Sequence, residues 1–128
     1  MISIHWASSA ALVRIIKDAG FHANKDWMSA RIVATAKYLI HTGRLAPSAF
    51  APSKLLTPGQ IALLRKIAHN TYREPDGTVL SMFVIENPVE RGVFSSLKRM
   101  GLVQHNSKVR HHAACWLTLF GETIFKEL

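Results

Sequence analysis

The sequence predicts a mainly α-helical protein whose C-terminal lobe is built around one helix and a small β-hairpin. Two observations lead to this prediction. Apolar residues recur at three- and four-residue steps in four stretches, and polar cap residues or helix-breaking residues bound each stretch. The last stretch ends at Gly101 and is followed by an extended, basic segment that returns as an apolar strand, which is typical of a helix leading into a hairpin.

The first 44 residues contain two of these helices and form a predicted N-terminal extension. A serine at position 8 or 9 caps the first helix, and Asn24 or Asp26 caps a second helix over residues 27–41. Two helices joined by a short turn could themselves form a helix-turn-helix. A packing or dimer-forming extension is the commoner use of such a pair, and basic residues on its polar side are common on solvated helices.

Residues 45–56 contain two prolines and two serines, so we expect a connector there. The lobe then covers residues 57–128 and opens with Thr57, Pro58 and Gln60, which together are a helix-capping signature. Farther along, Glu74-Pro75-Asp76-Gly77 is a strong turn signal. Residues 78–84 fit either a short strand or a second helix.

The helix predicted over residues 88–100 is the centre of this lobe. Asn87 is its cap, Glu90 stands at the reciprocal position of a capping box, and Gly101 is its left-handed stop. Its apolar stripe is expected to face the core and consists of Val89, Val93, Phe94, Leu97 and Met100. The hairpin over residues 104–114 follows, and it carries basic residues and three histidines but no acid.

A helix followed by a basic hairpin is the sequence outline of a winged helix, and three segments resemble one family in particular. They are "LTPGQIALLRKIA" (Leu56 to Ala68), "SSLKRMGLVQ" (Ser95 to Gln104) and "WLTLFGETIFKEL" (Trp116 to Leu128). In order and spacing they resemble the MarR-like winged helix-turn-helix family. There they are the first helix of the DNA-binding lobe, the end of the recognition helix, and the strand-to-helix exit from the wing.

The resemblance implies double-stranded DNA binding by a small transcriptional regulator. The recognition helix would read the major groove, with contacts from Arg91, Ser95, Ser96, Lys98 and Arg99. Lys108 and Arg110 would be wing contacts on phosphates. Arg110 matches the family's wing-tip arginine, although Val109 replaces the acidic residue that usually precedes it. Such a fold would also need a small helix before the recognition helix, and residues 79–85 are the only room for it.

Composition agrees with a polyanionic partner and argues against other classes. The net charge is +8, with 16 Lys plus Arg against 8 Asp plus Glu, and this balance favours nucleic acid. No apolar run is long enough to cross a membrane, so we expect a cytoplasmic protein. We also expect a homodimer, formed through the N-terminal helices because the family's longer C-terminal helix does not follow Leu128.

The sequence offers no catalytic constellation, and we expect no enzyme activity, no cofactor and no metal site. His111 and His112 are adjacent, so as strand residues they point to opposite faces and cannot easily share a metal ion. Cys115 lies in an apolar strand and is expected to be a buried thiol. The alternative function is a winged-helix protein–protein interaction module, such as a mobile-element or phage-type factor that binds and inhibits a host complex.

Overall fold

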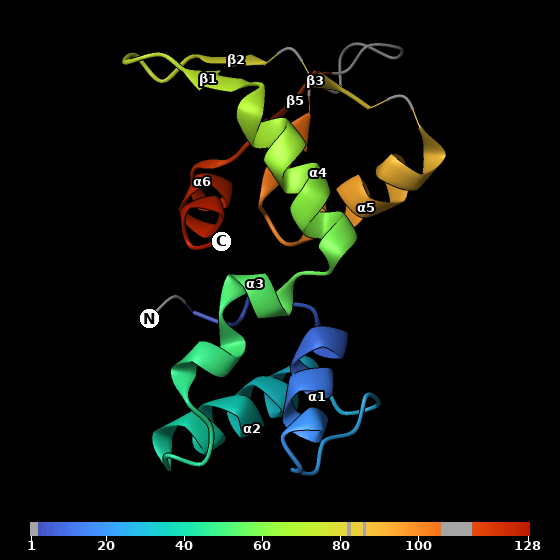
Figure 1. Ribbon diagram of the computed structural model, residues 1–128, viewed down its shortest axis with the longest axis vertical. Coiled ribbons are helices and arrows are strands. Elements are labelled where there is room, and N and C mark those ends of the chain that lie inside the picture. The colour runs from blue at the N-terminus through green and yellow to red at the C-terminus, as the bar shows by residue number, and fades with distance from the viewer. Residues whose placement is uncertain (1–2, 82, 86, 106–113) are drawn as a thin grey trace. The chain divides into compact units, whose positions relative to one another are not determined.

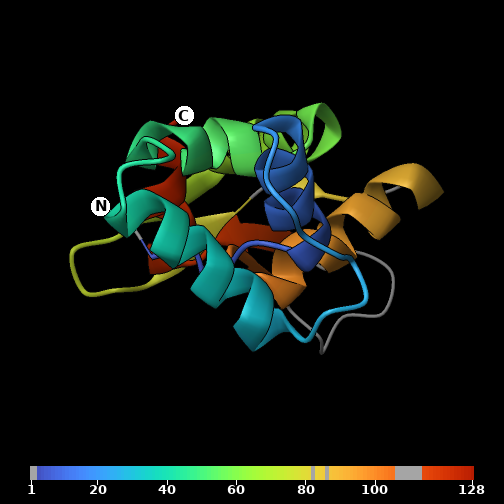
Figure 2. The same cartoon turned by 90° about the horizontal axis from the view of Figure 1, so that it is seen from below.

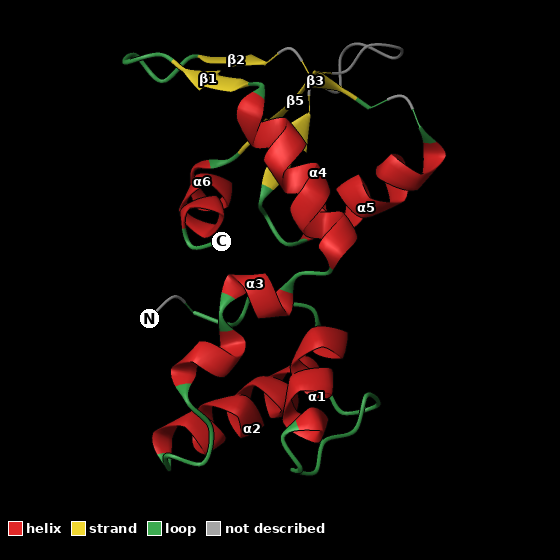
Figure 3. Ribbon diagram, viewed as in Figure 1, coloured by secondary structure: helices red, strands yellow, loops and turns green. Residues whose placement is uncertain are grey.

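The chain folds into two compact units, residues 1–56 and 57–128 (Figure 1). The computed structural model describes residues 3–81, 83–85, 87–105 and 114–128. Within these ranges the protein is mostly helical, and its strands belong to two small antiparallel sheets of the second unit (Figure 3). This agrees with the predicted helix-rich fold that carries a small β-structure.

The regular elements in the described part of the first unit are all helical (Figure 2). Its elements are α1 (Ser9–Asp18), α2 (Ser29–His41), a 3₁₀ turn η1 (Pro47–Phe50) and α3 (Pro52–Leu55). The Ser8 hydroxyl caps α1 by accepting the Ala11 N–H at 3.2 Å. The apolar sides of α1 and α2 pack together into a core with Leu12, Ile16, Ile32 and Ala36 at its centre.

The start of α2 differs from the predicted one. The helix begins at Ser29, after Met28, and neither predicted cap residue caps it. The Asn24 side chain instead accepts the Asp26 N–H at 2.8 Å, and its carbonyl accepts the Trp27 N–H. Asn24 therefore closes a turn ahead of α2 and does not cap the helix, because its short side chain hydrogen-bonds to nearby backbone N–H groups.

Residues 45–56, predicted as a connector, fold as part of the first unit. Phe50 and Leu55 are buried in its core, at 4% and 3% exposure. The Arg14 guanidinium on α1 donates a 2.8 Å hydrogen bond to the Lys54 carbonyl of α3. The prolines start short helical turns here, because a proline at the first helical position loses no hydrogen bond.

The second unit combines three helices with five short strands in its described part. The helices are α4 (Pro58–His69), α5 (Pro88–Arg99) and α6 (Leu119–Lys126). The strands are β1 (Thr71–Arg73), β2 (Val79–Ser81), β3 (Phe83–Val84), β4 (Val103–His105) and β5 (Ala114–Leu117). One sheet pairs β1 with β2, and the other has the order β3-β5-β4, with Phe83 opposite Cys115 and Val103 opposite Leu117.

Residues 78–84, which fitted either a short strand or a helix, contain the strands β2 and β3, and β2 pairs with β1 in a β-hairpin between α4 and α5. The predicted turn closes this hairpin: the Glu74 N–H donates to the Thr78 carbonyl at 2.8 Å, and Gly77 adopts a φ of 91°. The Asp76 carboxylate accepts the Thr78 N–H at 2.9 Å, and hydrogen bonds from Thr78 lower the pKa of Asp76. Within the described residues, no helix stands between α4 and α5 where a helix-turn-helix would place its second helix.

The core of the second unit confirms most of the predicted apolar stripe of α5. Phe94 and Leu97 are buried together with the buried residues of the other elements, which are Leu63, Leu64, Ile67, Leu102, Val103, Cys115, Leu117 and Ile124. Val89 was wrongly placed on this stripe, since it is 76% exposed. Residues seven positions apart lie on nearly the same side of a helix. Glu90 is therefore on the side of the buried Leu97, and its carboxylate pairs with Lys66 of α4. Val89 is thereby turned outward.

Candidate nucleic-acid interface

The outward face of α5 holds most of the predicted contact residues that the structure describes. Arg91, Ser95, Lys98 and Arg99 are all exposed, and their spacing places them on the side of the helix opposite Leu97. Gly92 lies among them, and a Cβ atom built at Gly92 meets no atom of the described chain within 4 Å. We call these five residues the α5 face. It is a cationic helix surface with low relief in its middle.

The positive charge of the α5 face is not neutralised within the described residues. The ion pairs in the described part of the chain join Lys66 to Glu90 at 3.3 Å and Arg73 to Glu122 at 3.2 Å, and neither includes a cation of the α5 face. Glu90 is the only acid in α5, and its carboxylate pairs with Lys66 of α4 and with no cation of the α5 face. The three cations of the α5 face are therefore available to a partner.

Glu90 was predicted to complete a capping box, and its carboxylate turns to Lys66 instead. The Asn87 side chain does cap α5, because its oxygen accepts the N–H groups of Val89 at 2.8 Å and Glu90 at 3.2 Å. This ion pair joins two residues that are 24 positions apart, so no local pattern could have predicted it.

Ser96, also predicted as a contact, lies on the side of α5 that faces α4. Its hydroxyl donates to the Val93 carbonyl at 2.7 Å and accepts from the Gln60 amide at 3.0 Å. The other end of the Gln60 amide accepts the Thr57 N–H at 2.9 Å, and the Thr57 hydroxyl accepts the Gln60 N–H, which completes the predicted capping box of α4. Gln60 thus links the cap of α4 to α5, and Ser96 serves that link.

The wing contacts cannot be placed, because Lys108 and Arg110 lie outside the described residues, as do His111 and His112. The described strands on either side of them, β4 and β5, form the expected antiparallel pair directly after α5. In this pair Gln104 is exposed and stands opposite Trp116.

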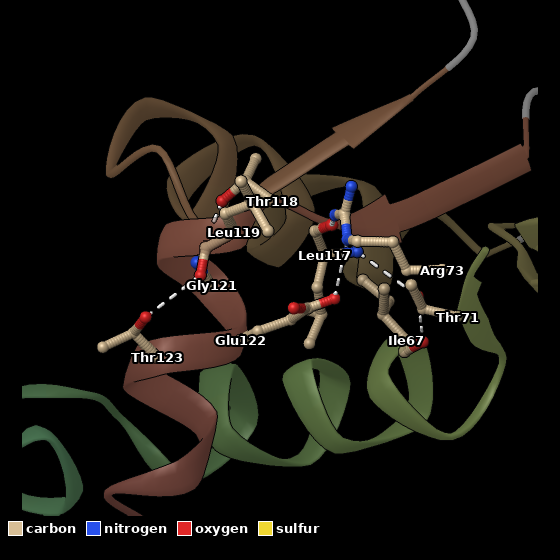
Figure 4. Close-up of polar contacts among 9 residues, drawn as sticks. All are labelled: Ile67, Thr71, Arg73, Leu117, Thr118, Leu119, Gly121, Glu122 and Thr123. Carbon is tan, nitrogen blue, oxygen red and sulfur yellow. Dashed lines mark hydrogen bonds and ion pairs between the residues drawn. The ribbon is translucent and has the colours of Figure 1, made fainter. Parts of the chain in front are cut away.

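A tight junction fixes the end of α5 against α6 and the sheet. Gly101 has a φ of 79°, in the left-handed region where glycine is favoured. The Thr118 hydroxyl donates to the Gly101 carbonyl at 2.6 Å. It also accepts the Gly121 N–H at 2.9 Å and so caps α6 (Figure 4). A Cβ atom at Gly121 would lie 2.0 Å from the Leu102 carbonyl oxygen. We call Gly101, Leu102, Thr118 and Gly121 the junction.

Arg73 belongs to a second set of contacts, which joins β1 to β5 and α6, and it is not part of an exposed cationic surface. Its guanidinium donates to the Leu117 carbonyl at 3.1 Å and pairs with Glu122 of α6 (Figure 4). The Thr71 hydroxyl donates to the Ile67 carbonyl at 2.7 Å and lies 3.3 Å from the Leu117 N–H, which donates to it. The β1–β2 hairpin is thereby tied to α4, β5 and α6.

Cys115 is buried as predicted, at 2% exposure, and burial raises the pKa of its thiol, which disfavours a reactive thiolate. Among the described residues, no three His, Cys, Asp or Glu side chains gather into a group that could hold a metal ion. No helix in the described part is long and apolar enough to cross a bilayer.

No protein-family model, curated protein or solved structure matches this chain. The resemblance to MarR-like proteins therefore remains an interpretation of the residues.

Proposed function

We propose that residues 57–128 form a DNA-binding lobe of the winged-helix kind, in which the α5 face enters the major groove of double-stranded DNA. The observation that carries this proposal is the α5 face itself: three exposed cations around Gly92 and Ser95, with the one acid of the helix paired to α4. A helix is about 10–12 Å across, which matches the major groove.

The elements around α5 support this function in their order. The helix leads into the β4–β5 pair, and β5 leads through the junction into α6. The β1–β2 hairpin, in place of a second helix, is a departure from the helix-turn-helix pattern. In this proposal α4 takes the supporting place of that second helix and holds α5 through the bonds of Gln60 and Lys66.

The biological role we propose is that of a small cytoplasmic transcriptional regulator without a cofactor or catalytic activity. We also propose a homodimer, because modules of this kind usually read two half-sites on opposite sides of a two-fold axis. Arginines on the α5 face can bridge guanine edges or phosphates, and Lys98 suits a phosphate.

Fluorescence anisotropy of a random-sequence DNA duplex, titrated at several salt concentrations, tests the proposal. Wild-type protein should bind at low salt and lose affinity steeply as salt rises, because released counterions drive phosphate contacts. Arg99→Ala should reduce the slope of log affinity against log salt by about 1, with little change in thermal stability. Lys126→Ala is the matched control, because it removes an equal charge from an exposed position on α6, and it should leave the slope nearly unchanged.

Two results would contradict the proposal. One is no binding by the wild type even at low salt, despite the charge of +8. The other is an equal effect of Arg99→Ala and Lys126→Ala, because the α5 face would then have no special part in binding. A large loss of stability in Arg99→Ala would mean that this side chain is structural.

A second candidate function, a protein-interaction module that inhibits a host complex, is favoured by one observation. Tyr72 and Leu80 stand directly opposite each other on the β1–β2 hairpin and remain 60% and 51% exposed. A paired apolar surface on a protruding hairpin suits a protein partner better than phosphates. Loss of a cross-linked partner in a Tyr72→Ser, Leu80→Ser variant, combined with absent DNA binding in the wild type, would favour this candidate.

A further inference from the structure

The first unit carries a second cationic helix surface, which the sequence pattern alone assigned to ordinary solvated charge. Exposed residues of α2 recur on one side of the helix, opposite the buried Ile32 and Ala36. They are Ala30, Arg31, Ala34, Lys37, Tyr38 and His41. We call Arg31, Lys37, Tyr38 and His41, together with Arg44 just beyond the helix, the α2 face.

We propose that the α2 face is a second DNA-contacting surface, which binds the phosphate backbone of a duplex. The inference rests on the proposed function for the identity of the polyanion, but it assigns the contact to a different unit and to different residues. It gives the N-terminal helices a function other than dimerisation.

The charge balance of the first unit supports this assignment. Residues 1–56 hold seven Lys and Arg against two Asp, which gives 7 − 2 = +5 of the chain's total of +8. Neither acid lies in α2: Asp18 ends α1, and Asp26 lies in the turn before α2. An acid-free helix with exposed cations attracts a polyanion without opposing charge of its own.

Aromatic rings hold two of these cations in place. The Arg44 guanidinium lies 5.8 Å from the centre of the Tyr38 ring, and the Arg31 guanidinium lies 3.9 Å from the centre of the Trp27 ring. Tyr38 is itself 56% exposed, so its hydroxyl is accessible to a phosphate oxygen. Stacked guanidiniums lose less conformational freedom on binding than unsupported ones, and they keep their N–H donors at the ring edge free for phosphates.

Lys37 is also positioned, because its ammonium group donates to the His5 ring nitrogen at 2.7 Å. Between these supported cations the surface is low: Ala34, Lys37, Tyr38, Ile40 and His41 line a shallow depression. Small residues at the centre of a helix face and long cations at its edges allow the helix to approach a phosphate backbone closely. The α5 face repeats this arrangement with Gly92 and Ser95 at its centre.

The geometry favours a duplex backbone over a lipid surface. The apolar side of α2 is buried in the core of the first unit, so it cannot enter a bilayer as an interfacial helix must. From Arg31 to His41 the helix rises about 15 Å. Duplex DNA carries one charge per roughly 1.7 Å of its axis, so several phosphates lie along such a length.

The test compares three variants in the salt-dependent anisotropy assay on the same random-sequence duplex. The α2 variant is Arg31→Gln, Lys37→Gln, Arg44→Gln. The charge-matched control is Lys17→Gln, Lys25→Gln, Lys54→Gln, which removes three exposed cations from α1, the turn after it and α3. The third is an α5 variant, Arg91→Gln, Arg99→Gln. Circular dichroism melting verifies that each is folded, and a double variant that retains Arg31 replaces the triple if loss of the Trp27 contact unfolds it.

The α2 variant should lower the slope of log affinity against log salt by about 2 to 3, since each lost phosphate contact contributes about 0.9. The control should lower it by less than half as much. Equal slopes in the α2 variant and the wild type, or equal losses in the α2 variant and the control, would overturn the inference.

The α5 variant separates this inference from the proposed function. An unchanged slope in the α5 variant together with a reduced slope in the α2 variant would refute the α5 face and support the α2 face. The reverse pattern would refute the α2 face alone. No DNA binding by the wild type at low salt would refute both.

Discussion

The junction lies at the C-terminal end of α5, next to the α5 face, but the two regions are constrained in opposite ways. In the junction, Thr118 makes two short hydrogen bonds and Gly121 lies against the Leu102 carbonyl with no room for a side chain. On the α5 face the side chains are exposed, and among the described residues the Ser95 hydroxyl bonds only to the Arg91 carbonyl of its own helix. The first region builds the lobe, and the second is open to a partner.

This difference clarifies what the sequence resemblance measures. The segments most like the MarR-like family are Gly101-Leu102-Val103 and Leu117-Thr118 with Gly121-Glu122. The structure places Gly101, Leu102, Thr118 and Gly121 in the junction. Leu117 and Glu122 contact Arg73, and Val103 stands opposite Leu117 in the β4–β5 pair. The resemblance in these segments therefore concerns how α5 is joined to the hairpin and to α6, whereas the residues of the α5 face lie outside them.

The largest expected effect is that of Gly121→Ala. The added Cβ atom would lie 2.0 Å from a backbone oxygen, so α6 and the Gly101–Val103 segment would have to separate. We expect a loss of about 3 kcal/mol in the free energy of unfolding, at the upper end of overpacking costs. Urea unfolding followed by circular dichroism measures it.

Gly59→Ala, in the first turn of α4, is the control for that substitution. A Cβ atom there meets its nearest neighbours at 4.0 Å, which is ordinary contact. A loss in Gly121→Ala no larger than in Gly59→Ala would mean that the junction is not tight, and the comparison with the α5 face would fail.

A smaller loss is expected from Thr118→Val, which retains the shape of the side chain but removes its hydroxyl. The Gly121 N–H would lose its cap and the Gly101 carbonyl its donor. A loss of about 1–2 kcal/mol follows from the usual contribution of a helix cap. Thr123→Val on the same helix is the control, because its hydroxyl donates to the Leu119 carbonyl one turn back and has no other hydrogen bond within the described chain. Urea unfolding should show a larger loss of stability in Thr118→Val than in Thr123→Val.

Local signals predicted the boundaries of most elements. Thr57 and Gln60 predicted the capping box of α4, Asn87 predicted the start of α5, and the turn at Glu74–Gly77 predicted the chain reversal between β1 and β2. Each of these signals involves residues at most four positions apart. Such short-range geometry is determined by the chain itself and is readable without knowledge of the fold.

Long-range pairings escaped prediction for the same reason. Gln60 bonds to Ser96 across 36 positions, and Arg73 pairs with Glu122 across 49. These contacts remove Ser96 and Arg73 from any exposed cationic or polar surface. The contacts of the α2 face escaped prediction as well: its cations were visible in the sequence, but their contacts with Trp27, Tyr38 and His5 depend on side chains that converge only in the folded unit.

The smallest expected effect is that of Gly92→Ala, which distinguishes a role of this glycine in stability from a role in DNA binding. A glycine inside a helix costs about 1 kcal/mol relative to alanine. Within the described chain nothing requires it, because the Cβ atom would enter open space and no positive φ is present at this residue. Gly92→Ala should therefore stabilise the second unit by about 0.5–1 kcal/mol in urea unfolding.

If the α5 face receives a DNA backbone or base edges at close range, the same methyl group should weaken binding in the anisotropy assay while the salt slope stays constant, since no charge is removed. Gly59→Ala, which adds the same methyl group to α4 and not to the α5 face, is the matched control for binding. A Gly92→Ala variant that gains stability and binds as the wild type does would show that no partner approaches this part of α5, and the face would then contact DNA through its long cations alone.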